Sequence, residues 1–177
     1  MPAIFAELGI TWTTVALVGA TAASSYATFA NVGLAQFGIV PFLTGKVGAL
    51  RLSPADKVGA WKAYFHAGAA WTLGAQALAA ALDAYAVVSA SGLVRTLAAH
   101  AGVLSLATVP LTLAFIHPVN VELLALADEG DKLSAEQGQQ VETLLGKWQR
   151  RNAWRHGAVS LLGWAFGIAA LVLDARA

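Results

Sequence analysis

Four histidines are the side chains of this sequence best suited to acid–base or metal chemistry. His66, His117 and His156 each fall near the same end of a long apolar segment, whereas His100 falls near the opposite end of its segment. A histidine whose pKa lies near the working pH is a suitable general base. The sequence therefore predicts a polar centre to which the first three histidines contribute.

Donors and aromatic rings accompany these histidines at helical spacing. Asn152 and Arg155 come directly before His156, and Asn120 follows His117 by about one turn. Amide and guanidinium groups can stabilise a negative charge that develops during a reaction, and aromatic rings can stack on a flat apolar ligand. The candidate catalytic residues are His66, His117, Asn152 and Arg155, and the candidate substrate-binding residues are Trp61, Tyr64, Asn120, Trp148 and His156.

Other catalytic chemistries have weaker support. The absence of cysteine excludes thiolate nucleophiles and thiolate metal sites. No carboxylate is expected inside an apolar segment, which argues against a Ser-His-Asp triad. A metal ion held by His66, His117 and His156 stays open because imidazole suits zinc, copper and iron, but no HxxxH or HxH pair supports it, so no metal is predicted. Without a GxGxxG or P-loop pattern, no nucleotide cofactor is expected either.

The composition indicates that these residues are positioned by membrane helices. Hydrophobic residues make up 58% of the 177 residues and charged residues only 12%, and the mean hydropathy is +0.64. Soluble domains are about 45–50% apolar and about 25% charged, so this chain has too few polar groups to cover a soluble surface. The lipid bilayer is therefore the first expected partner. Nucleic acid is not expected, since no basic stripe alternates with aromatic residues.

Four segments have the length and polarity of membrane spans. A span needs about 20 apolar residues, and the segments lie at about 12–37, 58–82, 96–117 and 154–173. The sequence therefore predicts an all-α fold, a single transmembrane four-helix domain over residues 1–177. The first segment is longer than a span needs, so either its helix is tilted or residues 36–41 leave the helix and lie at the membrane interface.

Local signals predict where helices begin. Ser53 followed by Pro54 reads as an N-cap with proline at the first helical position. Ser134 and Gln137 form a capping-box pattern at the end of a polar linker, residues 122–140. A short amphipathic helix is expected there, before the last span, with Val141, Leu144, Leu145 and Trp148 on its apolar face. Pro110 is expected to kink the third span.

The basic residues predict an orientation. Nine of the eleven lie in the first and third loops: Lys46, Arg51, Lys57, Lys62, Lys132, Lys147, Arg150, Arg151 and Arg155. The second loop holds only Arg95, and the C-terminal tail only Arg176. The positive-inside rule then places loops one and three in the cytoplasm and both termini on the opposite side.

The second half of the chain carries a pattern that resembles a known family. Its first part runs from Thr108-Val109-Pro110-Leu111-Thr112 through Phe115-Ile116-His117-Pro118-Val119-Asn120 to Leu123-Leu124. A polar insert follows, and then Leu144-Leu145-Gly146-Lys147-Trp148-Gln149-Arg150-Arg151-Asn152 and Arg155. In order and spacing, these motifs resemble the anthrone oxygenase-like family of small four-span membrane proteins, also called DUF1772, over about residues 105–170. His117 departs from the family pattern, in which an apolar residue is expected.

The resemblance implies an activity. Fungal members are associated with the oxidation of anthrones to anthraquinones in polyketide pathways, with molecular oxygen and without an evident organic cofactor. Transferred to this sequence, it implies a cofactor-independent oxidase with O2 as co-substrate and an apolar aromatic small molecule as substrate. Such a multi-pass membrane protein is expected in the endoplasmic reticulum if its source is eukaryotic.

Two other readings stay open beside the oxidase. The chain could be a non-catalytic membrane scaffold or subunit, alone or as an oligomer, whose polar residues only pack and hydrogen-bond. It could also be a membrane metalloprotein of the same architecture, with the histidines as ligands. A closed, dry cavity lined by His66, Trp148 and Arg155 would favour the oxidase, whereas a bundle packed solid at that level would favour the scaffold. Metal bound at a stoichiometric level would favour the metalloprotein.

Overall fold

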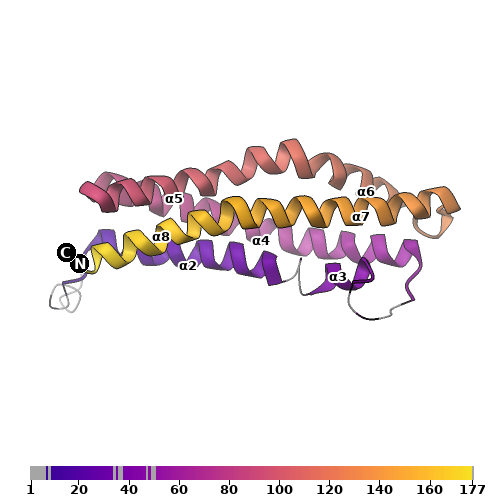
Figure 1. Ribbon diagram of the computed structural model, residues 1–177, viewed down its shortest axis with the longest axis horizontal. Coiled ribbons are helices and arrows are strands. Elements are labelled where there is room, and N and C mark those ends of the chain that lie inside the picture. The colour runs from indigo at the N-terminus through magenta and orange to yellow at the C-terminus, as the bar shows by residue number, and fades with distance from the viewer. Residues whose placement is uncertain are drawn as a thin grey trace. The chain divides into compact units, whose positions relative to one another are not determined.

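The regular structure of this chain is helical. The computed structural model describes residue 7, residues 9–33, 35, 38–46, 48 and 51–176, and no strand occurs among them. Four helical segments are long and apolar enough to cross a membrane, namely Trp12–Val32, Pro54–Ser89, Gly92–Lys132 and Ala135–Asp174. Figure 1 shows the order of the helices along the chain. The predicted all-α membrane fold with four spans is confirmed.

The exposed surface supports a lipid environment. Large apolar side chains stand open on the helices, among them Val88 with 81% and Trp71 with 72% of its surface exposed. Contiguous apolar surface of this kind is rare on soluble proteins, but it is what a hydrocarbon environment requires. The chain is an integral membrane protein.

The first half of the chain contains α2 (Trp12–Val32), the short α3 (Ile39–Leu43) and α4 (Pro54–Ser89). The first predicted span ended at residue 37, but residues 36 and 37 lie outside the described part of the chain, as does the start of the predicted interfacial segment 36–41. The end of that segment, residues 39–41, begins α3. A separate short helix therefore follows the first span.

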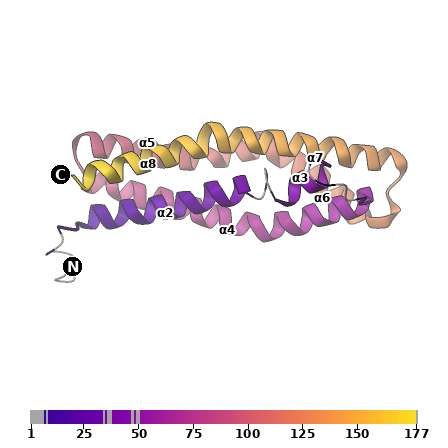
Figure 2. The same cartoon turned by 60° about the horizontal axis from the view of Figure 1, so that its bottom comes forward.

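The second half forms two continuous helical segments (Figure 2). In the first, α5 (Gly92–Leu111), the π-helix η2 (Thr112–Ile116), α6 (His117–Glu129) and the 3₁₀ turn η3 (Gly130–Lys132) follow one another. In the second, α7 (Ala135–Arg155), the π-helix η4 (His156–Ser160) and α8 (Leu161–Asp174) do the same.

The polar segment is therefore not a linker over residues 122–140, since only Leu133 and Ser134 separate the two helical segments. Polar residues there lie on exposed faces of helices instead of in a loop. The amphipathic helix α7 is also longer than predicted and runs directly into the last span.

Both predicted helix starts are confirmed. At α4, the Asp56 amide donates to the Ser53 hydroxyl oxygen at 3.1 Å, while the Ser53 amide donates to the Asp56 carboxylate at 3.2 Å. At α7, Ser134 and Gln137 make the same reciprocal pair of hydrogen bonds. Each pair satisfies amide groups that the first turn of a helix leaves unpaired.

The second loop is shorter than predicted. Only Ala90 and Ser91 separate α4 from α5, and Gly92 has a positive φ of 54°. Arg95 lies in the first turn of α5 and not in the loop, where its Nε donates to the Ala90 carbonyl oxygen at 2.9 Å.

Contacts divide the chain into two compact units. Unit 1 comprises residues 1–28, 73–108 and 157–177, and unit 2 comprises residues 29–72 and 109–156. Small residues let helices approach closely in unit 1, where a Cβ atom on Gly163 would lie 3.2 Å from the Cβ of Leu104. Unit 2 instead buries large side chains, and Trp61, Val119, Leu123, Val141 and Leu145 are all fully buried in its core.

One expectation about the spans is wrong. The second span was expected to end at Leu82, and no carboxylate was expected inside a span. The helix α4 continues to Ser89 and contains Asp83, of which only 2% is exposed. A hydropathy pattern ends a span at a charged residue, whereas the helix continues because the residues after Asp83 are again mostly apolar.

The close approach at Gly163 makes a testable prediction. Gly163→Leu should lower the free energy of unfolding in detergent by about 1–3 kcal/mol, because the new side chain has no space between α8 and α5. The matched control is Gly74→Leu, since a Cβ atom at Gly74 meets nothing within 4 Å. Equal stability of the two variants in a thermal or denaturant titration would contradict the packing described for unit 1.

Candidate functional site

The polar centre of unit 2 is organised by one guanidinium group. Arg155, the last residue of α7, donates from Nη1 to the Thr112 hydroxyl at 2.6 Å and from Nη2 to the Asn152 Oδ1 at 2.8 Å. The same Nη2 lies 2.8 Å from the His156 Nε2. We call these four residues the Arg155 centre. Planar guanidinium donors suit such fixed, multiple hydrogen bonding, which a lysine ammonium group cannot reproduce.

The hydrogen bond from Arg155 fixes the protonation of one imidazole nitrogen. A guanidinium group can only donate, so the His156 Nε2 must be the acceptor. An imidazole whose Nε2 accepts carries its proton on Nδ1 and is neutral. Only 1% of His156 is exposed, so Arg155 holds a buried, neutral histidine in one orientation.

Two donors of the Arg155 centre are left over. Among the described residues, the buried Nε of Arg155 and Nδ2 of Asn152 have no hydrogen-bond partner. Unsatisfied buried donors are uncommon and costly, by about 1–3 kcal/mol each. The Asn152 Oδ1 already accepts a hydrogen bond from Arg155, which fixes the orientation of the side-chain amide. The Asn152 Nδ2 can then donate only to an acceptor other than these residues. Donors preorganised in this way can bind an oxygen that carries negative charge.

The Arg155 centre stands where two helices change their geometry. Thr112 is the first residue of the π-helix η2, and His156 is the first residue of the π-helix η4. Short π-helical segments inside α-helices are rare and frequently lie at functional sites. The first of them comes two residues after Pro110, which cannot donate a backbone hydrogen bond and was predicted to disturb the third span.

An aromatic cluster lies in the same unit. The Trp148 ring meets those of Trp61 and Tyr64 edge to face, each with 6.1 Å between ring centroids, and Trp61 stacks on Phe65 at 5.2 Å. Tyr64 is also close enough to Arg155 for an electrostatic interaction. Tyr64 therefore links the aromatic cluster to the Arg155 centre.

The Trp148 ring is held by a hydrogen bond across unit 2. Its Nε1 donates to the Asn120 Oδ1 at 2.8 Å, and both residues are buried. The Trp61 Nε1, by contrast, is a third buried donor without a partner among the described residues. Six of the nine predicted site residues thus form two linked groups: Asn152, Arg155 and His156, and Trp61, Tyr64 and Trp148. Asn120 joins them through Trp148.

The structure does not bring His66 and His117 into these groups. Both side chains are exposed, and His66 makes a ring contact with its neighbour Phe65 at 5.5 Å. His156 is the only buried member of the three histidines. Among the described residues, no group of three His, Cys, Asp or Glu side chains comes together that could hold a metal ion. The catalytic roles of His66 and His117 therefore stay predictions, and no contact of either side chain with the described residues supports them.

Thr112 is the residue of the centre that sequence reasoning missed. It had been noted only as the end of a motif that begins at Thr108, because a threonine in an apolar span usually bonds its own helix. Its place after Pro110 was the available signal, since a disturbed helix can turn a hydroxyl toward a neighbour.

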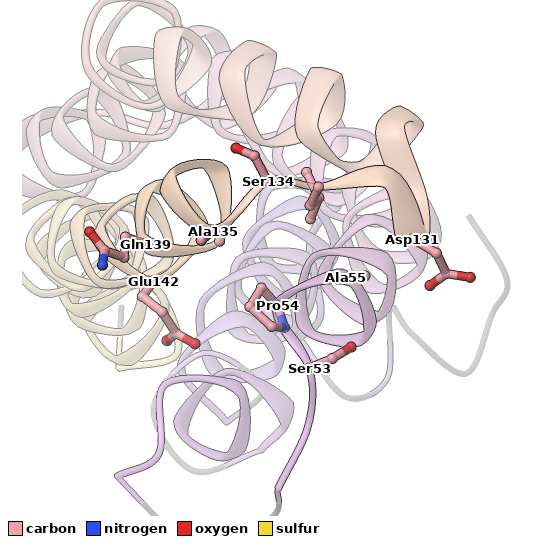
Figure 3. A pocket seen from close by; sticks show the side chains of 10 residues that line it. Ser53, Pro54, Ala55, Asp131, Ser134, Ala135, Gln139 and Glu142 are labelled. Atoms are coloured by element: carbon pink, nitrogen blue, oxygen red, sulfur yellow. The ribbon is translucent and has the colours of Figure 1, made fainter.

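A surface depression of about 450 Å³ lies elsewhere in unit 2, where α4 and α7 begin (Figure 3). It is lined by Ser53, Pro54, Ala55, Asp131, Leu133, Ser134, Ala135, Gly138, Gln139 and Glu142. None of the candidate site residues borders it. Nearby, Lys57 in the first turn of α4 pairs with Glu142 of α7 at 2.5 Å.

The fold and the polar centre define a small multi-span membrane protein with a buried cationic site. Residues 61–166 match the family described as Anthrone oxygenase, and the match spans every predicted site residue from Trp61 to His156. The chain belongs to the anthrone oxygenase family, as its motifs predicted. No curated protein and no solved structure matches the chain.

The hydrogen bond between Trp148 and Asn120 can be tested by substitution. Trp148→Phe keeps a ring but leaves the buried Asn120 oxygen without its donor, so the free energy of unfolding should fall by about 1–3 kcal/mol. Trp154→Phe is the control, because 57% of Trp154 is exposed. In the double variant with Asn120→Leu, part of the loss should be recovered. Strict additivity of the two substitutions would contradict a direct hydrogen bond.

Proposed function

We propose that this protein is an anthrone oxygenase-like oxidase that converts an anthrone-type aromatic polyketide to a quinone with O2. The observation that carries the proposal is the pair of buried, unpartnered donors on Asn152 and Arg155, next to a guanidinium charge. Such a pair is suited to an oxygen that gains negative charge during the reaction. Family membership supplies the reaction class.

The chemistry follows from the acidity of the substrate. Loss of a proton from C10 of an anthrone leaves an aromatic, phenolate-like anion whose charge rests largely on the carbonyl oxygen. Donation from Arg155 Nε and Asn152 Nδ2 to that oxygen stabilises the anion and so favours deprotonation. The electron-rich C10 then adds O2, and reprotonation gives a C10 hydroperoxide. Loss of water forms the new carbonyl, so one oxygen atom enters the product and the other leaves as water.

The aromatic cluster accounts for the substrate class. Trp61, Tyr64 and Trp148 give the site an aromatic, apolar environment that suits a flat tricycle, and the Trp61 Nε1 is one more donor for a ring oxygen. An apolar substrate dissolves in the bilayer, so a membrane-embedded enzyme can take it up without passage through water. O2 is also more soluble in hydrocarbon than in water.

His156 has a positioning role in this proposal. Its Nε2 accepts from Arg155, so it orients the guanidinium group together with Thr112 and leaves Nε for the substrate. Water or hydroxide takes up the C10 proton, and a proton is returned when the peroxide anion becomes the hydroperoxide, so no net proton is consumed. The proposal needs no organic cofactor, and O2 is the co-substrate.

Substitution of the two donors tests the proposal. Arg155→Met and Asn152→Ala should each lower kcat for the O2-dependent oxidation of emodin anthrone by about 10²–10³-fold, as removal of an oxyanion-binding donor does. The assay uses purified protein in lipid, with the spontaneous rate subtracted and with and without a chelator. Arg150→Met is the matched control, because Arg150 lies on the same helix and is exposed.

Each outcome has a clear meaning. Turnover that resists the chelator and falls only in the Arg155 and Asn152 variants supports the oxidase. Turnover that the chelator abolishes would favour a metalloprotein. No turnover above the spontaneous rate for the unaltered protein would contradict the proposed substrate and favour the scaffold reading.

A second test separates the two histidine assignments. His156→Ala should lower kcat more than tenfold, because Arg155 loses a partner, whereas His66→Ala should have little effect because His66 is exposed and outside the Arg155 centre. The measurement is the kcat of both variants under the same conditions. The reverse order would return the general-base role to His66, as the sequence had indicated.

A further inference from the structure

A buried carboxyl group in unit 1 has no part in the proposed oxidation. Asp83 lies in α4, a helix long and apolar enough to cross a membrane, and only 2% of it is exposed. Its Oδ1 is buried and has no hydrogen-bond partner among the described residues. Ionisable side chains inside a membrane are rare and usually mark a function.

The helix packing places Asp83 in a tight interface with α5. A Cβ atom on Gly102 would lie 3.2 Å from the Cβ of Asp83, so a larger residue there would require the two helices to shift by a few tenths of an ångström. On the same faces of the two helices, Thr108 donates to Gln76 Oε1 at 2.5 Å, and Ser105 is also buried. Polar side chains thus follow the α4–α5 interface, but Gln76 and Thr108 are already paired with each other.

No positive charge faces Asp83 from the described elements of unit 1. The helix α2 has no charged residue, and α8 has only Asp174, which accepts from Thr14 at 2.7 Å. On α5, Arg95 and His100 are exposed and contact backbone carbonyl oxygens of Ala90 and Thr96. The remaining titratable side chains of the described part of unit 1, namely Glu7, Tyr26, Tyr85 and Arg176, are exposed.

None of the described residues therefore supplies a partner for this buried oxygen, and we consider a metal cation and a proton in turn. A metal cation would need several oxygen ligands, because hard cations bind six or more oxygens. Besides Asp83, Thr21 offers the only other buried side-chain oxygen of the described residues that lacks a partner. A proton needs no further ligand, and it removes the charge that burial opposes.

We propose that Asp83 is a proton-binding site, a carboxylic acid held inside unit 1 that takes up and releases a proton as α4 and α5 separate or close at Gly102. In the closed interface the group is the neutral acid, the form that burial without a facing positive charge favours. Release of the proton leaves an uncompensated charge in this interface, so ionisation and the close contact exclude one another. The site is independent of the Arg155 centre and of the proposed oxidase activity.

Infrared spectroscopy of the full chain in lipid vesicles tests this directly. The spectrum at neutral pH should contain a protonated carboxylic acid band that corresponds to one group per chain and is absent from Asp83→Asn, which has nearly the same shape. Asp128→Asn is the control: Asp128 is exposed and pairs with Lys62, so the acid band should persist. Gly102→Leu, which wedges α4 and α5 apart, should reduce the acid band.

Two results would overturn the proposal. Identical acid bands in the unaltered protein and Asp83→Asn would mean that Asp83 is ionised. An acid band that appears only after sodium and potassium are removed would mean that a metal cation occupies the site. Size-exclusion chromatography of each variant checks the fold, and anthrone turnover is not part of the readout, so failure of the oxidase proposal leaves this test intact.

Discussion

A hydrocarbon environment supplies no hydrogen bonds, so each polar group inside this chain needs a partner within the chain. Backbone groups meet this requirement through the long helices. Where the helix geometry changes, side chains take over: Arg151 donates to the Phe115 carbonyl oxygen within η2, and Arg155 reaches Thr112 at its start. The irregular turns of the third span and the basic residues of α7 therefore depend on each other.

A few buried polar atoms of the described residues do not meet this requirement, and their types indicate what could bind there. In unit 2 they are the donors on Trp61, Asn152 and Arg155, whereas in unit 1 they include the acceptor on Asp83. Donors without partners suit a ligand with acceptor oxygens, and an acceptor without a partner suits a proton. The two units therefore differ in the kind of chemistry that they leave open, as well as in the size of the side chains in their cores.

Sequence reasoning predicted those features that depend on local pattern. Hydropathy predicted the four spans, and reciprocal capping patterns predicted the starts of α4 and α7. The apolar face of α7, with Val141 and Trp148, was also correct, because a single helix defines it. The family motifs led to Asn152 and Arg155, which the structure places in one hydrogen-bonded group.

What the sequence could not predict depends on the partners of a residue. His66 and His156 look equally suitable in the sequence, but only the packing of the helices shows that one is exposed and the other buried. Asp83 was missed because a charge ends an apolar run, although the helix continues. Thr112 was missed because its partner is 43 residues away along the chain.

The two-residue connection between α4 and α5 has a consequence for how the protein enters its membrane. With only Ala90 and Ser91 between them, the ends of the two helices stay close together, so the pair forms a tight hairpin. Arg95, the basic side chain at that tip, donates to the Ala90 carbonyl oxygen, so part of its hydration is replaced within the hairpin. A short connection whose charged side chain is already hydrogen-bonded favours insertion of the two helices as one unit over insertion of each alone.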